Sequence, residues 1–389
     1  MTKLAFTELT NSPIEFRGAL DFDLRKQGIS PRRLPDWTRM QVPEMMEVML
    51  RMPSGVRLAF TTSSRSVELH VLTTRMVNEG ADPRPMTFDL SIDDGEPLSQ
   101  SSDAGNDILL FADRPGEYEL KRGDAYTVRF DELAAGEKYC QLWLPQNAFV
   151  ELRSFSIEAG SSLGPPPAIE RSWVHYGSSI SHCMEAGQPT GVWPVVASRR
   201  GGIELTNLGF GGQCHLDQFV ARTIGELPAD LISIKVGINV ANMDSMRERV
   251  FTPALHGFLD TLRERKPDTP VILVSPIYCP CAEEHPGPTI PDKNGKFVTI
   301  PGSEDMRVGC LTLTRMREII ADVVEKRNAV GDAQLHYLNG LELFSEKDAH
   351  DLPDDLHPNP AGYARMGQRF ADRVFSGDSL LSQLTQGSD

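Results

Sequence analysis

The stretch from residue 159 to residue 167, Ala-Gly-Ser-Ser-Leu-Gly-Pro-Pro-Pro, constrains the fold of this chain more than any other segment. Because proline lacks a backbone N–H, we expect this stretch neither to extend a sheet nor to enter a helix interior. The stretch also separates two parts of the chain whose hydrophobic patterns differ. It therefore predicts a linker at 161–169 between two domains, and 389 residues exceed the usual size of a single core.

The part before this linker reads as a series of short strands. Apolar and polar residues alternate in Val-Glu-Leu-His-Val (67–71), and clusters such as Asp-Asp-Gly-Glu-Pro (93–97) separate the apolar runs. We expect an antiparallel, jelly-roll-like β-sandwich over 1–160, in which the first 55 residues add edge strands. Such a domain could contribute to substrate binding. The expected strands are 56–62, 66–73, 86–92, 107–111, 126–130, 138–144 and 149–157.

Beyond the linker, strand patterns alternate with helical patterns. This alternation predicts a parallel sheet with helices on both faces, in which binding residues gather at the carboxyl ends of the strands. We place this domain at 170–378, followed by a tail at 379–389. The expected strands are 172–176, 203–207, 230–236, 270–275 and 334–338, and the expected helices lie near 216–226, 246–265, 305–328 and 361–375.

Charge and cysteine usage limit the classes of partner. A formal net charge of −15 disfavours nucleic acid and anionic membrane surfaces, because both bind clustered Lys and Arg. No apolar run is long enough to span a membrane, and the first eight residues lack a hydrophobic signal segment. The scattered cysteines (140, 183, 214, 279, 281 and 310) favour reduced thiols in the cytoplasm, with export by an unusual route as the alternative. The oligomeric state stays open.

The last strand of the second domain is followed by an acid–histidine pair in Asp354-Asp355-Leu356-His357-Pro358. An acid three residues before a histidine can lie on the same side of one turn. There the carboxylate orients the imidazole and stabilises its charged form, as a general base requires. Asp355 is a rival for this orienting role, but Asp354 has the matching spacing.

Three further segments also follow strands. Ser179 comes directly after the first strand of the second domain, where a nucleophile would be exposed at the edge of the sheet. Gly212 ends the segment Asn-Leu-Gly-Phe-Gly-Gly after the second strand, and Asn239 follows the third strand. A glycine N–H and an asparagine amide can both donate to an oxyanion.

In this order, the four segments resemble the blocks of the SGNH (GDSL-type) hydrolase superfamily. Its namesake residues would be Ser179, Gly212, Asn239 and His357. The resemblance covers about residues 170–378 and implies a flavodoxin-like α/β/α domain that hydrolyses esters with no metal and no organic cofactor. It further implies that Asp354 orients His357.

The resemblance also implies a role for each residue. Ser179 attacks the acyl carbon, His357 removes its proton, and the oxyanion hole consists of the N–H groups of Ser179 and Gly212 with the amide of Asn239. The chain departs from the family pattern where Ser178 replaces the Asp of Gly-Asp-Ser and Val240 replaces the Asp that often follows the Asn. Neither position is a namesake, so these departures concern the subfamily more than the chemistry.

A β-sandwich in front of such a domain is similar to two-domain carbohydrate acetyl esterases. We therefore expect a metal-independent serine esterase that removes a short acyl group, such as acetyl, from a small-molecule or carbohydrate ester. Acyl transfer to an alcohol is the alternative within the enzyme class. A catalytically inactive carbohydrate-binding protein is the alternative outside it.

Each site residue also has a structural interpretation. Ser179 could simply cap a helix, and Asn242 could compete with Asn239 or cap the helix near 246. His182 and His215 could line the pocket, although solvent exposure or a structural hydrogen bond is the commoner role. The remaining competitors are Ser178 and Ser181 for the nucleophile, and Gly209 and Gly211 for the oxyanion donor.

Two other motifs invite a functional interpretation. Cys279-Pro280-Cys281, near Glu283, Glu284 and His285, suggests zinc, but the spacing is not that of a closed tetrahedral site. We interpret 276–303 instead as a proline-rich insertion that forms a lid or a pocket wall over the active site. Arg32 and Arg33 could bind a sugar or a carboxylate, although surface charge is the commoner explanation.

Overall fold

The computed structural model describes residues 1–376 except 112, 115 and 301–306, so the predicted tail at 379–389 lies outside the described residues. The chain divides into two compact units. The first contains Met1–Arg39, Glu47–Ile169 and Ala186–Val192, and the second contains Met40–Met46, Glu170–Glu185 and the chain from Trp193 onward. The main division falls between Ile169 and Glu170. Two short segments are exceptions: residues 40–46 belong to the second unit, and residues 186–192 belong to the first.

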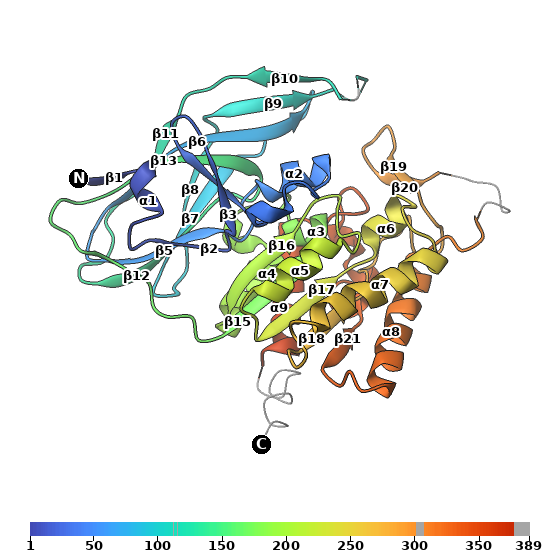
Figure 1. Cartoon of the computed structure of the whole chain (residues 1–389). Helices are drawn as coiled ribbons and strands as arrows, with labels where there is room; N and C mark the ends of the chain where they lie inside the picture. Colours follow the sequence, from blue (N-terminus) through green and yellow to red (C-terminus); the bar gives the residue numbers. More distant parts are fainter. Residues whose placement is uncertain (112, 115, 301–306, 377–389) are drawn as a thin grey trace. The chain divides into compact units, whose positions relative to one another are not determined.

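The first unit is a sandwich of two sheets, which confirms the predicted β-sandwich (Figure 1). One sheet has the order β10-β9-β6-β13-β4-β3, with β1 on β13 and β11 on β6. The other has the order β14-β5-β12-β7-β8, with β2 on β5. The strands are β1 (Thr2–Ala5), β2 (Glu15–Arg17), β3 (Asp21–Leu24), β4 (Ile29–Arg32), β5 (Arg57–Thr62), β6 (Val67–Asn78), β7 (Met86–Ile92), β8 (Leu98–Ser102), β9 (Asn106–Leu110), β10 (Tyr118–Lys121), β11 (Tyr126–Phe130), β12 (Lys138–Trp143), β13 (Ala148–Ile157) and β14 (Leu163–Gly164).

Strand β6 explains how the sandwich forms from its sequence. Every second residue of β6 is buried, beginning with Val67, Leu69 and Val71, as a strand with one face on a core requires. The core includes Phe60 of β5 and Phe155 of β13, whose rings pack edge to face with centroids 5.0 Å apart. The two sheets thus bury their apolar faces against each other.

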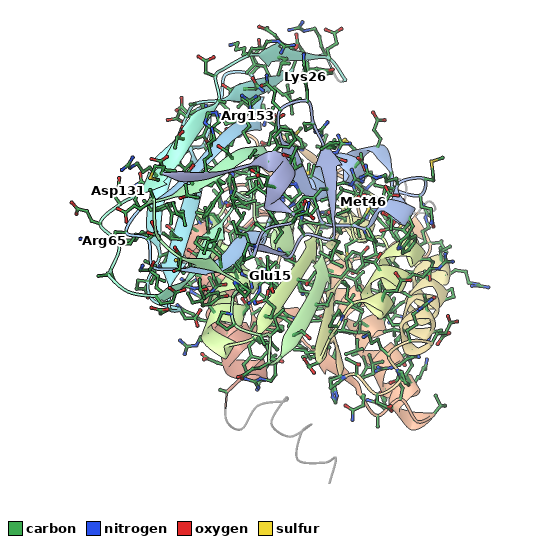
Figure 2. The ribbon with its side chains drawn as sticks, turned by 60° about the vertical axis from the view of Figure 1, so that its left-hand side comes forward. Glu15, Lys26, Met46, Arg65, Asp131 and Arg153 are labelled. Carbon is green, nitrogen blue, oxygen red and sulfur yellow. The ribbon has the colours of Figure 1, made fainter. Side chains whose placement is uncertain are left out.

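Charged side chains occupy the outward face of the sandwich. Arg129 of β11 forms ion pairs of 2.6 Å with Glu68 and with Asp131. Figure 2 shows Asp131 and Arg65 at the surface of this unit. Alternation along the strands therefore separates an apolar core from a charged exterior. This unit also contains the helices α1 (Phe6–Leu9) and η1 (Asp36–Thr38, a 3-10 helix), so it is not built from strands alone. Helix α2 (Glu44–Leu50) has its first three residues in the second unit and the rest in the first.

Two predictions about the strands of this unit are wrong. Strand β6 pairs with β9 in parallel, so the sandwich is not purely antiparallel. Strand β14 lies inside the predicted linker and pairs with Thr61 and Thr62 of β5. Leu163 and Gly164 can join the sheet because they retain their N–H groups, and the prolines begin only at residue 165.

The interpretation of Arg32 and Arg33 as surface charge is also wrong, because both side chains are fully buried. The guanidinium of Arg32 forms two hydrogen bonds with the carboxylate of Glu47, at 2.6 and 2.9 Å. Arg33 donates to the carbonyl of Met49 at 2.8 Å, and burial lowers the pKa of Arg33 to about 9. Both arginines therefore have structural partners within the first unit.

The second unit is built around a parallel five-stranded sheet of order β16-β15-β17-β18-β21, with helices packed against it (Figure 1). Numbered along this unit, the order is 2-1-3-4-5, which confirms the flavodoxin-like fold. The strands are β15 (Ser172–Gly177), β16 (Glu204–Gly209), β17 (Leu231–Lys235), β18 (Val271–Val274) and β21 (Leu335–Leu338), and the insertion adds a hairpin of β19 (Thr289–Pro291) and β20 (Phe297–Thr299).

Helices cover both faces of this sheet. Trp173 of β15 stacks on Phe370 of α9 with ring centroids 4.9 Å apart, and Tyr176 of the same strand stacks on Phe258 of α7 at 5.5 Å. Since alternate strand residues point to opposite faces, α9 and α7 lie on opposite sides of the sheet. Helix α4 packs with α9, while α5 and α8 pack with α7. The helices are α3 (Ser179–His182), α4 (Trp193–Gly201), α5 (Gln218–Glu226), α6 (Ile238–Asn242), α7 (Glu248–Arg263), α8 (Leu313–Ala329) and α9 (Pro360–Val374), with 3-10 helices η2 (Pro189–Gly191, in the first unit), η4 (Gly340–Glu342) and η5 (Glu346–Asp351).

The predicted boundary of one helix differs from the structure. Helix α8 begins at Leu313 rather than near 305, because the side chain of Thr312 caps it by accepting from the N–H of Arg315 at 3.1 Å. Residues 305 and 306 lie outside the described part. None of the helices in the described parts combines the length and the apolar character that crossing a bilayer requires.

Candidate active site

Ser179 lies directly after the first strand of the parallel sheet. Strand β15 ends at Gly177, Ser178 is the N-cap residue, and Ser179 is the first residue of α3. The interpretation of Ser179 as the cap is therefore wrong, since Ser178 has that position. As the first helical residue, Ser179 has a backbone N–H with no partner inside the helix. Its position at a strand end is the one that the sequence predicts.

The turn that carries Ser179 is held by buried hydrogen bonds around Ser181. The Nδ2 of Asn207 donates to the carbonyl of Ser181 at 3.0 Å, and the hydroxyl of Ser181 lies 2.7 Å from Nε2 of His175. A Cβ on Gly209 would lie 2.5 Å from the carbonyl carbon of Ser181, and the N–H of Gly209 donates to Asn207. Ser181 and Gly209 are thus engaged in packing α3 against β16, and the competing interpretations of both as catalytic groups lose their support.

Ser179, His357 and Asp354 come together in one chain of hydrogen bonds. Nε2 of His357 lies 3.0 Å from Oγ of Ser179, and Nδ1 of His357 lies 2.7 Å from Oδ2 of Asp354. The other carboxylate oxygen of Asp354 accepts from the backbone N–H of His357 at 2.6 Å and of Leu356 at 3.0 Å. The short turn from 354 to 357 therefore fixes the carboxylate and the imidazole relative to each other.

The charge of Asp354 determines the direction of these hydrogen bonds. Burial tends to raise the pKa of Asp354, but its hydrogen bonds from His357 and Leu356 outweigh burial and hold that pKa below the ordinary value. An ionised carboxylate can only accept, so Nδ1–H of His357 donates to Asp354 and Nε2 is left as the acceptor. The hydroxyl of Ser179 then donates to Nε2, which is the arrangement needed for the imidazole to remove its proton.

The rival acid, Asp355, has a different partner. Both of its carboxylate oxygens bind Nζ of Lys296, at 2.8 and 3.0 Å. The backbone of Asp355 has φ +63°, in the left-handed region, and its N–H donates to the carbonyl of Leu352 at 3.2 Å. The structure therefore brings Asp354, and not Asp355, to the imidazole.

The two remaining namesake residues are connected to each other through the loop after β16. Gly212 has φ +69°, and its carbonyl accepts from Nε2 of His215 at 3.3 Å. Nδ2 of Asn239 donates to the carbonyl of the next residue, Gln213, at 2.8 Å. Within the described residues the N–H of Gly212 has no hydrogen-bond partner, which leaves it available to a ligand.

Three side chains near the namesake residues, His215, His182 and Asn242, are placed as follows. His215 bonds to Ser245 through Nδ1 at 2.9 Å, in line with a structural role. His182 is fully buried, so solvent exposure does not describe it. Asn242 ends α6, and Arg247 is the N-cap residue of α7, so the interpretation of Asn242 as the cap of that helix is wrong.

An aromatic residue of the insertion after β18 contacts the imidazole of His357. This residue, Phe297, belongs to none of the motifs in the sequence. The ring of Phe297 in β20 lies edge to face against the ring of His357, with centroids 5.9 Å apart. The backbone N–H of Phe297 also donates to the carbonyl of Asp354 at 3.0 Å. Phe297 thus places the insertion beside His357. Residues 301–303 of the insertion lie outside the described part, and its role as a lid or a pocket wall stays a prediction. No local pattern marks Phe297, because its partner is 60 positions away.

The acidic residue nearest to the cysteine motif has a cation as its partner. Arg317 donates to both carboxylate oxygens of Glu283, at 2.7 and 2.8 Å. Throughout the described part of the chain, no group of three or more His, Cys, Asp or Glu residues is arranged to hold a metal ion. These contacts favour a structural role for Glu283.

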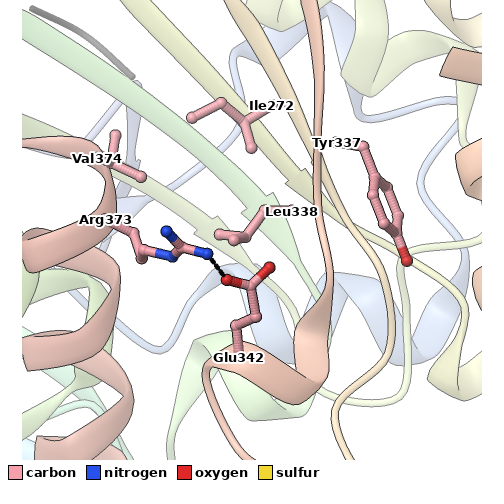
Figure 3. Close-up of a pocket in the computed structure, with 6 residues that line it drawn as sticks. All are labelled: Ile272, Tyr337, Leu338, Glu342, Arg373 and Val374. Atoms are coloured by element: carbon pink, nitrogen blue, oxygen red, sulfur yellow. Dashed lines mark hydrogen bonds and ion pairs between the residues drawn. The ribbon is translucent and has the colours of Figure 1, made fainter. Parts of the chain in front are cut away.

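A separate cavity of about 120 Å³ lies between α9, η4 and the strands β18 and β21 (Figure 3). An ion pair between Arg373 and Glu342 borders it. None of its lining residues is a predicted site residue. The lining residues are Ile272, Tyr337, Leu338, Glu342, Arg373 and Val374.

A parallel sheet of order 2-1-3-4-5, with Ser179, His357 and Asp354 gathered at its strand ends, is the arrangement of an esterase-type hydrolase domain. Residues 175–365 match the family described as GDSL-like Lipase/Acylhydrolase, so the chain contains a domain of this family. This finding confirms the resemblance to SGNH (GDSL-type) hydrolases. No curated protein matches the chain.

Solved structures extend the similarity to the whole chain. A salicylyl-acyltransferase, SsfX3, from a tetracycline biosynthetic pathway is 28% identical, with 95% of each chain covered and a TM-score of 0.77. A protein described as a GDSL-like lipase, from Bacteroides ovatus, is 18% identical to this chain. The match covers 99% of this chain and 98% of the other, with a TM-score of 0.66. A family two carbohydrate esterase from Clostridium thermocellum, in complex with cellohexaose, is 14% identical, covering 92% and 97%, with a TM-score of 0.55. Family and fold together support an acyl hydrolase or an acyltransferase.

Proposed function

We propose that this chain is a serine esterase that hydrolyses short-chain acyl esters through an acyl-Ser179 intermediate. The observation that carries the proposal is the chain of hydrogen bonds from Ser179 through His357 to Asp354, at 3.0 and 2.7 Å. A serine hydroxyl is a weak nucleophile unless an adjacent base accepts its proton. His357 is within reach to do so, and Asp354 stabilises the imidazolium that results.

The reaction follows from these contacts. As Oγ of Ser179 attacks the carbonyl carbon of the ester, its proton passes to Nε2 of His357. When the tetrahedral intermediate collapses, the same proton passes from Nε2 to the leaving alcohol, and the acyl group stays on Ser179. A water molecule then gives a proton to Nε2 and attacks the acyl carbon. When this second tetrahedral intermediate collapses, the proton passes from Nε2 to Oγ of Ser179, which releases the acid and restores the serine.

The oxyanion of each tetrahedral intermediate needs donors in place before the reaction. The N–H groups of Ser179 and Gly212 and the side-chain amide of Asn239 would supply them. Support comes from the N–H of Gly212, which has no partner among the described residues, and from the hydrogen bond that ties Asn239 to Gln213, the neighbour of Gly212. No step of this scheme requires a metal or an organic cofactor.

The substrate is proposed to be a hydroxylated or sugar-like compound that carries a small acyl group such as acetyl. The carbohydrate esterases among the similar structures support the sugar-like part. Phe297 beside His357 supplies an apolar surface for one side of the ester. A cytoplasmic location belongs to the same proposal. The contribution of residues 1–160 to substrate binding stays a prediction, which comparison of the fragment 170–389 with the whole chain would test.

Acyl transfer to an alcohol is the second candidate, and one observation favours it. The structure with 28% identity over 95% of both chains is a salicylyl-acyltransferase. Hydrolysis and transfer share the acyl-serine intermediate and differ only in whether water or an alcohol attacks it. Product analysis with a competing polyol such as glycerol separates them, because a transferase yields the glycerol ester whereas an esterase yields the free acid.

The variant Ser179→Ala tests the proposed function. Removing a nucleophile of this kind lowers kcat by about 10⁴-fold or more. We expect turnover of p-nitrophenyl acetate to fall by that order while the circular dichroism spectrum stays unchanged. Ser181→Ala is the matched control on the same helical turn, and it should retain far more activity. Near-normal turnover by Ser179→Ala would overturn the proposal.

A further inference from the structure

Two cysteine thiols lie against the turn that carries Asp354 and His357. Cys279 and Cys281 follow β18 at the start of the insertion, and their Sγ atoms are 3.5 Å apart. The thiol of Cys279 also donates to the backbone carbonyl of Asp355 at 3.3 Å. A cysteine side chain therefore contacts Asp355, one of the two residues between the members of the acid–histidine pair.

The position of this thiol pair is fixed by buried contacts. The N–H of Cys279 donates to Glu283 at 2.9 Å, and the carboxylate of Glu283 is held by Arg317. Arg317 in turn donates to the backbone carbonyls of Pro276 and Ile277, at 3.0 and 3.1 Å. The segment before the cysteines is thus anchored to α8, which keeps the two sulfur atoms close together.

The two thiols differ in exposure and in acidity. Cys279 is fully buried, whereas Cys281 is partly exposed. The hydrogen bond between the sulfur atoms raises the pKa of Cys279, with burial adding to the effect, and the same bond lowers the pKa of Cys281. Cys281 is therefore the thiol that meets solvent and has the lower pKa of the two, which are the properties of an attacking thiol.

We propose that Cys279 and Cys281 form a redox modification site that controls the active-site turn. In the first step the thiolate of Cys281 attacks one sulfur of a low-molecular-weight disulfide, forming a mixed disulfide and releasing one thiolate, which takes up a proton. In the second step Cys279 loses its proton and attacks Sγ of Cys281, which releases the second thiol. The two protein thiols are oxidised by two electrons, and the small disulfide is reduced to two thiols.

The bond formed in this way would act on the turn from 354 to 357. The sulfur atoms must approach from 3.5 Å to about 2.05 Å, and Cys279 no longer has a hydrogen to donate to the carbonyl of Asp355. Asp355 already has the unfavourable φ of +63°, so its conformation depends on such contacts. Loss of this contact shifts the turn, and with it the alignment of His357. The effect on activity rests on the proposed function, whereas disulfide formation does not.

The chemical part is tested on the full-length reduced protein with oxidised glutathione as the probe. We expect a mass loss of about 2 Da, from the two hydrogens removed, and a cross-link between Cys279 and Cys281 in peptide mapping. Dithiothreitol should reverse both changes. Cys281→Ser should abolish the mass loss, and Cys310→Ser, which removes another partly exposed thiol, should not. A mass that stays unchanged, or a stable glutathione adduct without the internal disulfide, would overturn the proposal.

The structural part is tested by hydrogen exchange of the peptide that covers residues 352–358. We expect faster exchange in the oxidised protein and no change in oxidised Cys281→Ser. Hydrolysis of p-nitrophenyl acetate should fall by about tenfold or more on oxidation, since small misplacements of catalytic groups have effects up to about 10²-fold. A disulfide that forms without changing either exchange or activity would overturn the link to the turn. If the reduced protein has no activity at all, the proposed function fails, while the mass and exchange results still decide the redox site.

Discussion

Nε2 of His357 lies 3.0 Å from Oγ of Ser179, although the two residues are 178 positions apart in the chain. The parallel sheet accounts for this meeting. Ser179 follows β15, an inner strand of the sheet. His357 lies in the chain segment after β21, which is an edge strand of the same sheet. Because all five strands run in the same direction, the segments that leave their carboxyl ends converge on one edge of the sheet.

Exchanging the acid tests which carboxylate orients the imidazole. We expect Asp354→Asn to lower kcat by about 10⁴-fold, because the amide favours the wrong tautomer of His357. Asp355→Asn removes a carboxylate that binds Lys296 instead, so kcat should fall less than about tenfold, the loss of an exposed ion pair being small. The measurement is the steady-state hydrolysis of p-nitrophenyl acetate by both variants. A larger loss in Asp355→Asn than in Asp354→Asn would assign the roles the other way round.

Removing the ring of Phe297 tests whether the insertion contributes to catalysis. Phe297→Ala removes a ring contact with His357, and such contacts contribute about 0.5–1.5 kcal/mol. We therefore expect kcat/KM to fall by about two- to tenfold, and Phe297→Tyr to restore most of it. Val298→Ala is the matched control, because Val298 is the next residue of the same strand and 40% exposed. Equal effects at the two positions would mean that the contact with His357 has no special role.

The folding stability of the second unit should depend on Asp348 at acidic pH. Burial tends to raise the pKa of Asp348, but hydrogen bonds from Arg369 and Ser345 outweigh it and lower the pKa from 3.8 to about 2. Because the folded-state pKa lies below the unfolded one, the carboxylate stabilises the fold fully above about pH 4. This contribution, on the order of 2 kcal/mol, is lost as the pH falls from about 4 to 2.

Asp348→Asn is the variant that measures this contribution. It should lower the free energy of unfolding at pH 7 by about 2 kcal/mol, and its difference from the native chain should vanish near pH 2. Asp322→Asn is the control, since Asp322 pairs with Lys326 on the surface of α8 and such pairs contribute only about 0.3–0.5 kcal/mol. Urea unfolding at several pH values gives both numbers. A difference that persists unchanged at pH 2 would contradict the prediction.

Gly237 lies two residues before Asn239, and any larger residue at position 237 would be strained. Its φ is +124°, and a Cβ there would lie 2.1 Å from Sδ of Met316. We expect Gly237→Ala to lower the free energy of unfolding by more than about 3 kcal/mol, the combined effect of strain and overpacking. Gly257→Ala, inside α7 with open space around the new methyl group, should instead raise it by about 0.5–1 kcal/mol. Thermal unfolding of both variants makes the comparison, and a stable Gly237→Ala would contradict the close approach.

The sequence predicted those strands whose pattern is strong. The predicted ranges 86–92 and 126–130 coincide with β7 and β11, and β-branched and aromatic residues recur in both. Strand β10 carried no such signal, since all four of its residues are exposed. The extension of β6 beyond residue 73 was also missed. There the inward positions include Arg75, whose charge is compensated by Asp103 and Asp107 from distant segments.

The site residues that could be predicted from the sequence are likewise those that stand in local motifs. Ser179, Asp354 and His357 could be found because each stands in a short motif after a strand. Phe297 could not, because its contact with His357 depends on how the insertion folds back. The cysteine motif was visible in the sequence, but the contact of Cys279 with Asp355 was not, for the same reason. Arg32 was misinterpreted for a related reason, since its partner Glu47 lies 15 residues away and no local pattern marks the pair as buried.

Covalent labelling of the nucleophile tests the central claim most directly. A fluorophosphonate reacts with a serine whose proton an adjacent base removes, so the adduct identifies the activated hydroxyl. The account predicts a single adduct, mapped by mass spectrometry to Ser179, that forms in the native chain and not in His357→Ala over the same time. An adduct on another serine, or none in a folded protein, would contradict the assignment of Ser179 as the nucleophile.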